Sequence, residues 1–468
     1  MKKDYLEIIA AEPAVILEKG IEEGKKLEQR LIKKEPLKLA EEYWSTLGPG
    51  LTTGASDDDP SGIATYSQTG AQYGFQLLWL AAFTFPLMAI VQEMCARIGV
   101  VTGHGLAANI RNHYSRPVLY TTTILLFAAN TFNIGADLGA MAQGVRLLAP
   151  NLNATWLIAA FASVSLLLQI FTTYARYAKY LKYLALVLLA YIFSALLSHL
   201  NWSEVIHHSI IPSLSFSKDQ IYLVCAILGT TISPYLFFWQ TSQEVEEENL
   251  RNRHHTNRHA NGSALQQNDP TWHQHVSKRD VREIRTDVWS GMFFSNVVMF
   301  FIIAACAGTL YAHGITNIVT AADAAIALRP LAGDAAYFLF AIGIIGTGML
   351  AIPVLAGSTS YALSESFGWK YGLYRKLKEA YAFYGIIIIS MALGFILNLT
   401  GLDPIKALIY SAVANGLVAP IVLFLIVRMS SDKGIMQEYV NHPAITWIGW
   451  LTTGIMAIAG IAAIVSLI

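Results

Sequence analysis

The chain has 468 residues and a formal net charge of zero; 54% of its residues are hydrophobic and only 14% are charged. A typical soluble domain has about 25% charged residues, so a soluble globular protein is excluded, and the neutral balance offers no field to attract nucleic acid. The apolar residues form long uncharged runs, several of which approach the ~20 residues that cross a bilayer as a helix. The sequence therefore predicts an all-α integral membrane protein.

The first 45 residues precede these runs and mix lysine with glutamate. They predict a cytoplasmic amphipathic segment and not a cleavable signal peptide, which would open with a short apolar core. After this segment we predict eleven transmembrane helices, near 46–73, 76–100, 117–148, 154–174, 179–200, 220–243, 287–312, 334–364, 380–399, 404–428 and 443–467.

Lysine and arginine are distributed very unevenly over the connections between these helices. With the N-terminus inside, the inside segments hold 28 of the 32 Lys and Arg residues, as the positive-inside rule requires. We therefore expect a cytoplasmic N-terminus in a plasma (inner) membrane. An odd number of spans then places the C-terminus outside.

The first predicted helix is interrupted by the sequence SDDDPSG at 56–62. Pro60 removes a backbone donor, and Gly62 lets the chain bend freely. Carboxylates are costly in a membrane and are expected to face a wet cavity or a cation. We choose Asp59, directly before the proline, as a metal ligand. Asp57 and Asp58 are expected to line the approach, since consecutive helical residues point about 100° apart.

The sixth predicted helix carries a matching interruption, GTTISPYLFF, with Gly229 and Pro234 between apolar halves. Helices one and six each open a unit of five, so we expect an inverted repeat of the LeuT type. Its first half is 46–200 and its second half 220–428, followed by an eleventh helix at 443–467. Interrupted helices at corresponding positions of two halves indicate the midplane binding site of a transporter.

The longest polar interruption, 244–285, is predicted to be a cytoplasmic loop. It holds five of the twelve histidines: His254, His255, His259, His273 and His275. Histidine clusters also occur in membrane di-iron enzymes, but those repeat several such clusters at helix ends, and this chain has one. We expect a solvated loop and no enzymatic activity.

The two interruptions resemble those of the NRAMP family of divalent-metal transporters, and the resemblance extends over the first ten predicted helices. In that family the first break reads Asp-Pro-Gly-Asn and the sixth carries Met-Pro-His, where this chain has Asp59-Pro60-Ser61-Gly62 and Ser233-Pro234-Tyr235. The flanking sequences GPGL, QYGFQLLWL and AGSTSYALSESFGW also agree.

The differences from the family pattern favour one chemical class of metal ion. Gly62 replaces an asparagine ligand and opens space, and Ser233 replaces a soft thioether with a hard hydroxyl. Thr230 falls where the family uses a backbone carbonyl as ligand. Oxygen ligands favour Mg²⁺ over softer transition metals, and Mg²⁺ keeps several of its waters. The resemblance therefore implies a largely hydrated Mg²⁺ as the transported ion, with Mn²⁺ also possible, as in the NRAMP-related magnesium transporters; no cofactor is expected.

The proton-coupling residues of the family also differ here. Tyr235 stands in place of a histidine, and a tyrosine, with a reference pKa near ~10, does not shuttle protons near neutrality. Asp137 is retained in the third predicted helix, but Ala140 aligns with the family's following glutamate. We therefore expect transport uncoupled from protons.

Two alternatives stay open: a proton-coupled transporter of Mn²⁺ or another hard metal ion, and a non-transporting NRAMP-like sensor. The sensor would be expected to carry a large soluble output domain, whereas this chain ends at Ile468 in a final span. The sequence does not indicate the oligomeric state.

Overall fold

The structure is a computed structural model that describes residues 48–172, 186–198, 200–259 and 278–467. The chain divides into two compact units, Met1–Gly48 and Pro49–Ile468. The predicted amphipathic segment at 1–45 lies outside the described residues. Within the described part of the second unit every regular element is a helix, which confirms the all-α prediction.

The α-helices of the described residues, in chain order, are α3 (Pro49–Asp57), α4 (Pro60–Tyr73), α5 (Trp79–Thr102), α6 (Leu106–His113), α7 (Arg116–Leu148), α8 (Ala154–Phe171), α10 (Leu189–Leu197), α11 (Trp202–Ile210), α12 (Lys218–Thr231), α13 (Pro234–His259), α14 (Lys278–Thr309), α15 (Ala321–Ala325), α16 (Arg329–Ala332), α17 (Ala336–Phe367), α18 (Tyr381–Asn398), α19 (Pro404–Ser430), α20 (Lys433–Met436) and α21 (Pro443–Leu467). Short 3₁₀ turns adjoin them at Leu186–Leu188, Tyr311–His313, Ile326–Leu328, Gly333–Ala335, Leu377–Glu379 and Gln437–Tyr439.

Nine helical segments of the described residues are long and apolar enough to cross a membrane. Eleven were predicted, and the two remaining regions are the first and the fifth. The first appears as the two short helices α3 and α4, and the fifth, at 179–200, lies partly in 173–185, outside the description. The peripheral helix α8 exposes Trp156 and Phe171 by 77% and 78%. Such large apolar side chains on an outer helix fit contact with lipid and not with water.

The segment 244–285, predicted to be a loop, is helical at both ends. α13 continues to His259 and α14 begins at Lys278. Alternating acidic, amide and basic residues after the apolar stretch lack the glycine or proline that would end a helix, so α13 extends beyond its apolar half. His254, His255 and His259 lie on this extension and their side chains are outside the description, as are His273 and His275.

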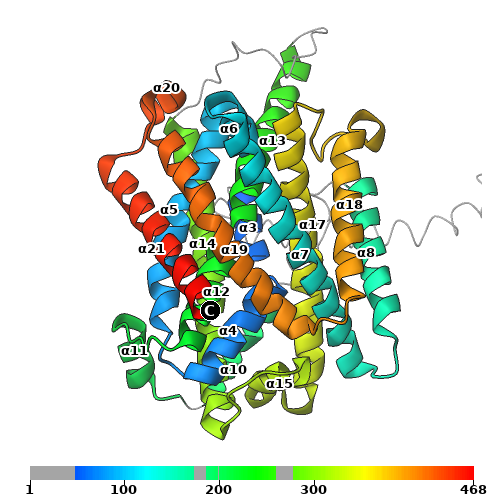
Figure 1. The fold of residues 1–468 in the computed structure, drawn as a ribbon, viewed down its shortest axis with the longest axis vertical. Helices are drawn as coiled ribbons and strands as arrows, with labels where there is room; N and C mark the ends of the chain where they lie inside the picture. The colour runs from blue at the N-terminus through cyan, green and yellow to red at the C-terminus, as the bar shows by residue number, and fades with distance from the viewer. Residues whose placement is uncertain (1–47, 173–185, 199, 260–277, 468) are drawn as a thin grey trace, which may run out of the picture. The chain divides into compact units, whose positions relative to one another are not determined.

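The two interrupted helix pairs, α3 with α4 and α12 with α13, occupy the middle of the helix bundle. Figure 1 shows α4 and α12 below α3 and α13 in the view chosen. α14 packs against α3 and α4, while α19 packs against α4, α7 and α12. Long helices therefore surround the two places where the chain leaves the helical conformation.

Candidate metal centre

The first break lies between α3 and α4 and is built by local chemistry. Asp59 has an extended backbone and forms the N-cap of α4, and Pro60 follows at its first position. Proline is well suited there because the first amides of a helix have no partner within it. The Asp59 Oδ1 atom accepts hydrogen bonds from the Gly62 amide at 2.7 Å and from the Ser61 hydroxyl at 2.6 Å. The capping contacts thus fix this carboxylate at the break.

The second break lies between α12 and α13, where α12 ends at Thr231 and α13 begins at Pro234. The Ser233 hydroxyl donates to the carbonyl oxygens of Gly229 and Thr230, both at 2.7 Å. Its oxygen lone pairs remain available, because a hydroxyl has two acceptor positions besides its single proton. The hydroxyls of Ser61 and Thr230 lie 3.4 Å apart, so the two breaks meet.

A side chain from a third helix orients Asp59. The Asn133 amide on α7 donates to Asp59 Oδ2 at 3.0 Å, and Asn133 Oδ1 accepts from the Ser411 hydroxyl on α19 at 2.9 Å. Sequence reasoning missed both residues. Asn133 could have been found as an amide in an apolar run one turn before Asp137, since polar groups inside membrane helices are costly.

Gly62 is closely surrounded where the two breaks meet. A Cβ atom built on Gly62 would lie 3.3 Å from Thr230 Oγ1, 3.3 Å from the Tyr66 ring and 3.4 Å from the Asp57 carbonyl oxygen. Even a single methyl group at this position would therefore crowd its neighbours. We predicted that the missing side chain opens room for an ion here; in this conformation the neighbours pack closely against Gly62, and the prediction stays a prediction.

Asp57 and Asp58 contact a different helix. Asp57 Oδ2 and Asp58 Oδ1 accept hydrogen bonds from the Ser295 hydroxyl on α14, at 2.5 and 3.3 Å. Both side chains are buried. Within the described residues no group of three or more His, Cys, Asp or Glu is placed to hold a metal ion. The three aspartates therefore do not form one carboxylate cluster.

Tyr235 and Asp137 are both buried near the breaks but differ in their partners. The Tyr235 hydroxyl donates to the Ser56 carbonyl oxygen at 3.0 Å, which ties α13 to the last turn of α3. Neither carboxylate oxygen of Asp137 has a hydrogen-bond partner among the described residues. A buried carboxylate of this kind is held either protonated or beside a cation or water.

The electrostatics of the breaks favour a cation. In the described part of the chain, the hydrogen-bond donors to Asp57, Asp58 and Asp59 are neutral hydroxyl and amide groups. α3 and α12 end at the breaks with partial negative charge, while α4 and α13 begin there with partial positive charge, so the aspartates supply the net negative charge. An oxygen-lined, negative and buried centre with one well-held carboxylate can bind a positive ion.

The chain also matches known proteins. Residues 50–466 match the family model described as Nramp, "Natural resistance-associated macrophage protein-like". The chain belongs to the Nramp family. Its membership confirms the family resemblance noted in the sequence, and it identifies this Nramp chain as a metal transporter of the membrane and not an enzyme.

Solved structures resemble this Nramp chain in fold. A crystal structure of the Eremococcus coleocola manganese transporter, in complex with an aromatic bis-isothiourea substituted compound, matches with a TM-score of 0.70 at 17% identity, over 90% of this chain and 86% of that one. A mutant of that transporter matches with a TM-score of 0.67 at 17% identity, over 88% and 84%. MhsT in complex with L-phenylalanine matches with 0.51 at 14% identity, over 90% and 97%. The helical arrangement is thus LeuT-like.

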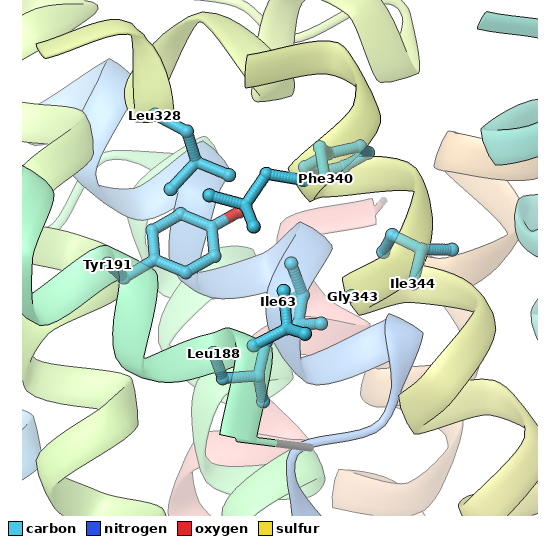
Figure 2. Close-up of a pocket in the computed structure, with 9 residues that line it drawn as sticks. Ile63, Leu188, Tyr191, Leu328, Phe340, Gly343 and Ile344 are labelled. Atoms are coloured by element: carbon cyan, nitrogen blue, oxygen red, sulfur yellow. The ribbon is translucent and has the colours of Figure 1, made fainter. Parts of the chain in front are cut away.

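A small cavity lies behind the first break of the Nramp chain, between α4, α10 and α17 (Figure 2). Ile63, next to Gly62, forms one wall, and Tyr191 and Phe340 form others. Its volume is about 10 Å³, close to the minimum for one water molecule. Apart from Tyr191 its lining is apolar, so this cavity does not provide the oxygen ligands that a metal ion needs.

A larger hollow of about 450 Å³ lies beside α4 and α12 on the side away from α3. Gln68, Asp219 and Tyr222 are among its lining residues. The chosen ligands do not line it, and Asp59, Thr230 and Ser233 are all no more than 1% exposed. The centre of this Nramp chain is therefore closed to solvent in this conformation.

Proposed function

We propose that this chain transports Mg²⁺ as a largely hydrated ion through a site formed by Asp59, Gly62, Thr230 and Ser233, without coupling to protons. The observation that carries the proposal is the set of oxygen atoms that the two breaks bring together beside Asp59, where the hydroxyls of Ser61 and Thr230 lie 3.4 Å apart. Hard oxygen ligands suit Mg²⁺, and because Mg²⁺ dehydrates reluctantly we propose that it enters with most of its waters once this closed site opens.

The hydrogen bonds that Asp59 already accepts support transport of a hydrated ion. A carboxylate has about four lone-pair positions, and three neutral donors, from Ser61, Gly62 and Asn133, already occupy Asp59. Few lone pairs of Asp59 therefore remain free to coordinate a metal ion directly, while the neutral donors leave the negative charge of the carboxylate uncompensated. Such a group attracts a divalent ion whose own waters make most of the direct contacts.

The absence of coupling is proposed from the residues around the site. Tyr235 donates its proton to a backbone carbonyl, an arrangement that holds the proton and does not relay it. Asp57 and Asp58 are proposed to line the approach beside α14, and Asp137 to lie in a secondary cavity. A divalent ion gains roughly 4.6 kcal/mol per 100 mV of membrane potential, twice the single-charge value, which suffices to drive uptake.

A second candidate is transport of Mn²⁺ or another hard ion, with protons. The similar fold of a manganese transporter favours it, and Asp137 is a buried carboxylate without a hydrogen-bond partner in the described residues. The same oxygen-lined site would accept Mn²⁺.

We also propose how the chain crosses the membrane. We infer eleven spans in two inverted units of five, with a cytoplasmic N-terminus and an outside C-terminus in the plasma membrane. The positions of the two breaks support this arrangement, because half-helix ends at the midplane are where such transporters bind ions.

Purified protein in liposomes that contain a pH-sensitive dye tests these proposals, with potassium and valinomycin setting the voltage. We expect uptake of Mg²⁺ and Mn²⁺ that follows the potential without acidification of the lumen. Failure to carry Mg²⁺ while carrying Mn²⁺ would refute the magnesium assignment. Metal-dependent acidification at zero potential would establish the proton-coupled alternative.

A further inference from the structure

One face of α14 follows the short helix α3 along its whole length. Asp287, Gly291 and Ser295 are spaced at i, i+4 and i+8, which places them on one stripe of a helix. Each of them contacts α3, at its beginning, middle and end in turn. We call these three residues the α14 stripe.

Asp287 holds the beginning of α3. Its carboxylate oxygens accept hydrogen bonds from the backbone amides of Gly50 at 2.6 Å and Leu51 at 3.1 Å. The first amides of a helix have no partner within it, and a negative charge there is favourable to the helix dipole. Asp287 is 3% exposed, so this cap comes from another helix through a buried contact.

In the middle of the contact, α3 and α14 approach each other closely because neither helix has a side chain there. A Cβ atom on Gly54 would lie 2.3 Å from the Gly291 carbonyl oxygen, and one on Gly291 would lie 2.1 Å from the Gly50 carbonyl oxygen. Real Cβ atoms do not approach so closely, so the two backbones touch only because both positions are glycine. At the end of α3, Ser295 donates to Asp57 at 2.5 Å.

The position of α3 determines one wall of the candidate metal centre. α3 has only nine residues and is separated from α4 by the break at Asp58 and Asp59. No continuous helix fixes α3 relative to α4, so the position of α3 depends on its own packing contacts. The Asp57 carbonyl oxygen at the end of α3 packs against Gly62, 3.4 Å from a Cβ built there.

We propose that Asp287 is a positioning residue that keeps α3 docked on the α14 stripe and thereby holds the end of α3 against the candidate metal centre. The inference rests on the proposed function only in taking the breaks as the ion site. Docking itself requires no metal.

Hydrogen exchange with mass spectrometry on the full-length protein tests the docking without any metal. Asp287→Ala removes both acceptors, and each hydrogen bond to a charged group contributes enough to change an opening equilibrium about tenfold or more. We expect peptides covering α3 to exchange about tenfold faster, with exchange in α7 and α17 unchanged. Glu283→Ala is the matched control, since Glu283 lies one turn earlier on α14 and pairs with Arg279 at the surface.

A second, milder variant keeps the proposal testable if Asp287→Ala does not fold. Ser295→Ala leaves the Asp287 cap in place and removes one hydroxyl, and it should raise α3 exchange by a smaller factor, again without changing α17. In liposomes, Asp287→Asn should change the turnover of metal uptake more than its KM, because the ligands stay in place. Unaltered α3 exchange in the Asp287 and Ser295 variants, or a rise equal to that in Glu283→Ala, would overturn the proposal. Because exchange is measured without transport, this outcome is separate from a failure of the magnesium assignment.

Discussion

Replacing Asp59 with asparagine should separate its two roles, as a helix cap and as the charged ligand. Aspartate and asparagine cap helices about equally well, so the amide oxygen can still accept from the Gly62 amide. The new amide nitrogen would meet the Asn133 donor, but a flip of Asn133 restores the contact. Ser411 then accepts from Asn133 while it still donates to the Leu408 carbonyl oxygen. We therefore expect Asp59→Asn to fold with nearly unchanged stability.

The loss of charge should have a large effect on the ion. For a hydrated divalent ion about 4 Å from the carboxylate, at an effective dielectric constant near 20, the attraction is about 8 kcal/mol. Desolvation offsets part of this. If only about a third remains as net binding energy, the affinity for Mg²⁺ or Mn²⁺ falls about a hundredfold, and uptake falls with it.

The assay combines calorimetric ion binding, thermal unfolding and uptake into liposomes. Asp403→Asn is the matched control, because Asp403 is an exposed cap of α19 that accepts from the Lys406 amide at 3.1 Å. It should bind and carry metal like the wild type. Asp59→Ala should in addition lower the free energy of unfolding by about 1 kcal/mol, because it also removes the helix cap. If Asp59→Asn binds metal within threefold of the wild type, the carboxylate is not the charged ligand and the reasoning fails.

Three further predictions concern the site and the fold. Gly62→Ala should crowd Thr230 at 3.3 Å, lowering Mg²⁺ uptake more than Mn²⁺ uptake in competition assays; an unchanged ratio would contradict the hydrated-ion model. Ser233→Met should give calorimetric Cd²⁺ binding that the wild type lacks, because a thioether favours soft ions; preferential Cd²⁺ binding by the wild type would instead count against an oxygen-only site. Glu93→Ala removes an acceptor that binds Arg285 at 2.8 Å. This change should lower the free energy of unfolding by about 1.5–3 kcal/mol, which is measured as a lower unfolding temperature. An unchanged unfolding temperature would show that the ion pair is dispensable.

Local patterns in the sequence were enough to predict the class of the protein and where along the chain to place the candidate site. Apolar runs long enough for a bilayer predicted a helical membrane protein, because backbone polar groups in lipid must be satisfied within the segment. The two prolines indicated where helices are interrupted, since proline acts on its own turn: Pro60 and Pro234 each stand first in the helix that follows a break. The motif around Asp59 also carried the family resemblance. These are local effects, and local effects can be read from neighbouring residues.

Which side chains surround each aspartate depends on packing between helices that are far apart in the sequence. Asp59 meets Asn133, which is 74 positions away, and Asp57 meets Ser295, which is 238 positions away. Hydropathy carries no information about such pairs, because a single amide or hydroxyl barely changes the character of an apolar run. The same packing assigned the adjacent Asp57 and Asp59 to different partners. Helix periodicity could separate these carboxylates in direction, but only the positions of α7 and α14 determined what each one contacts.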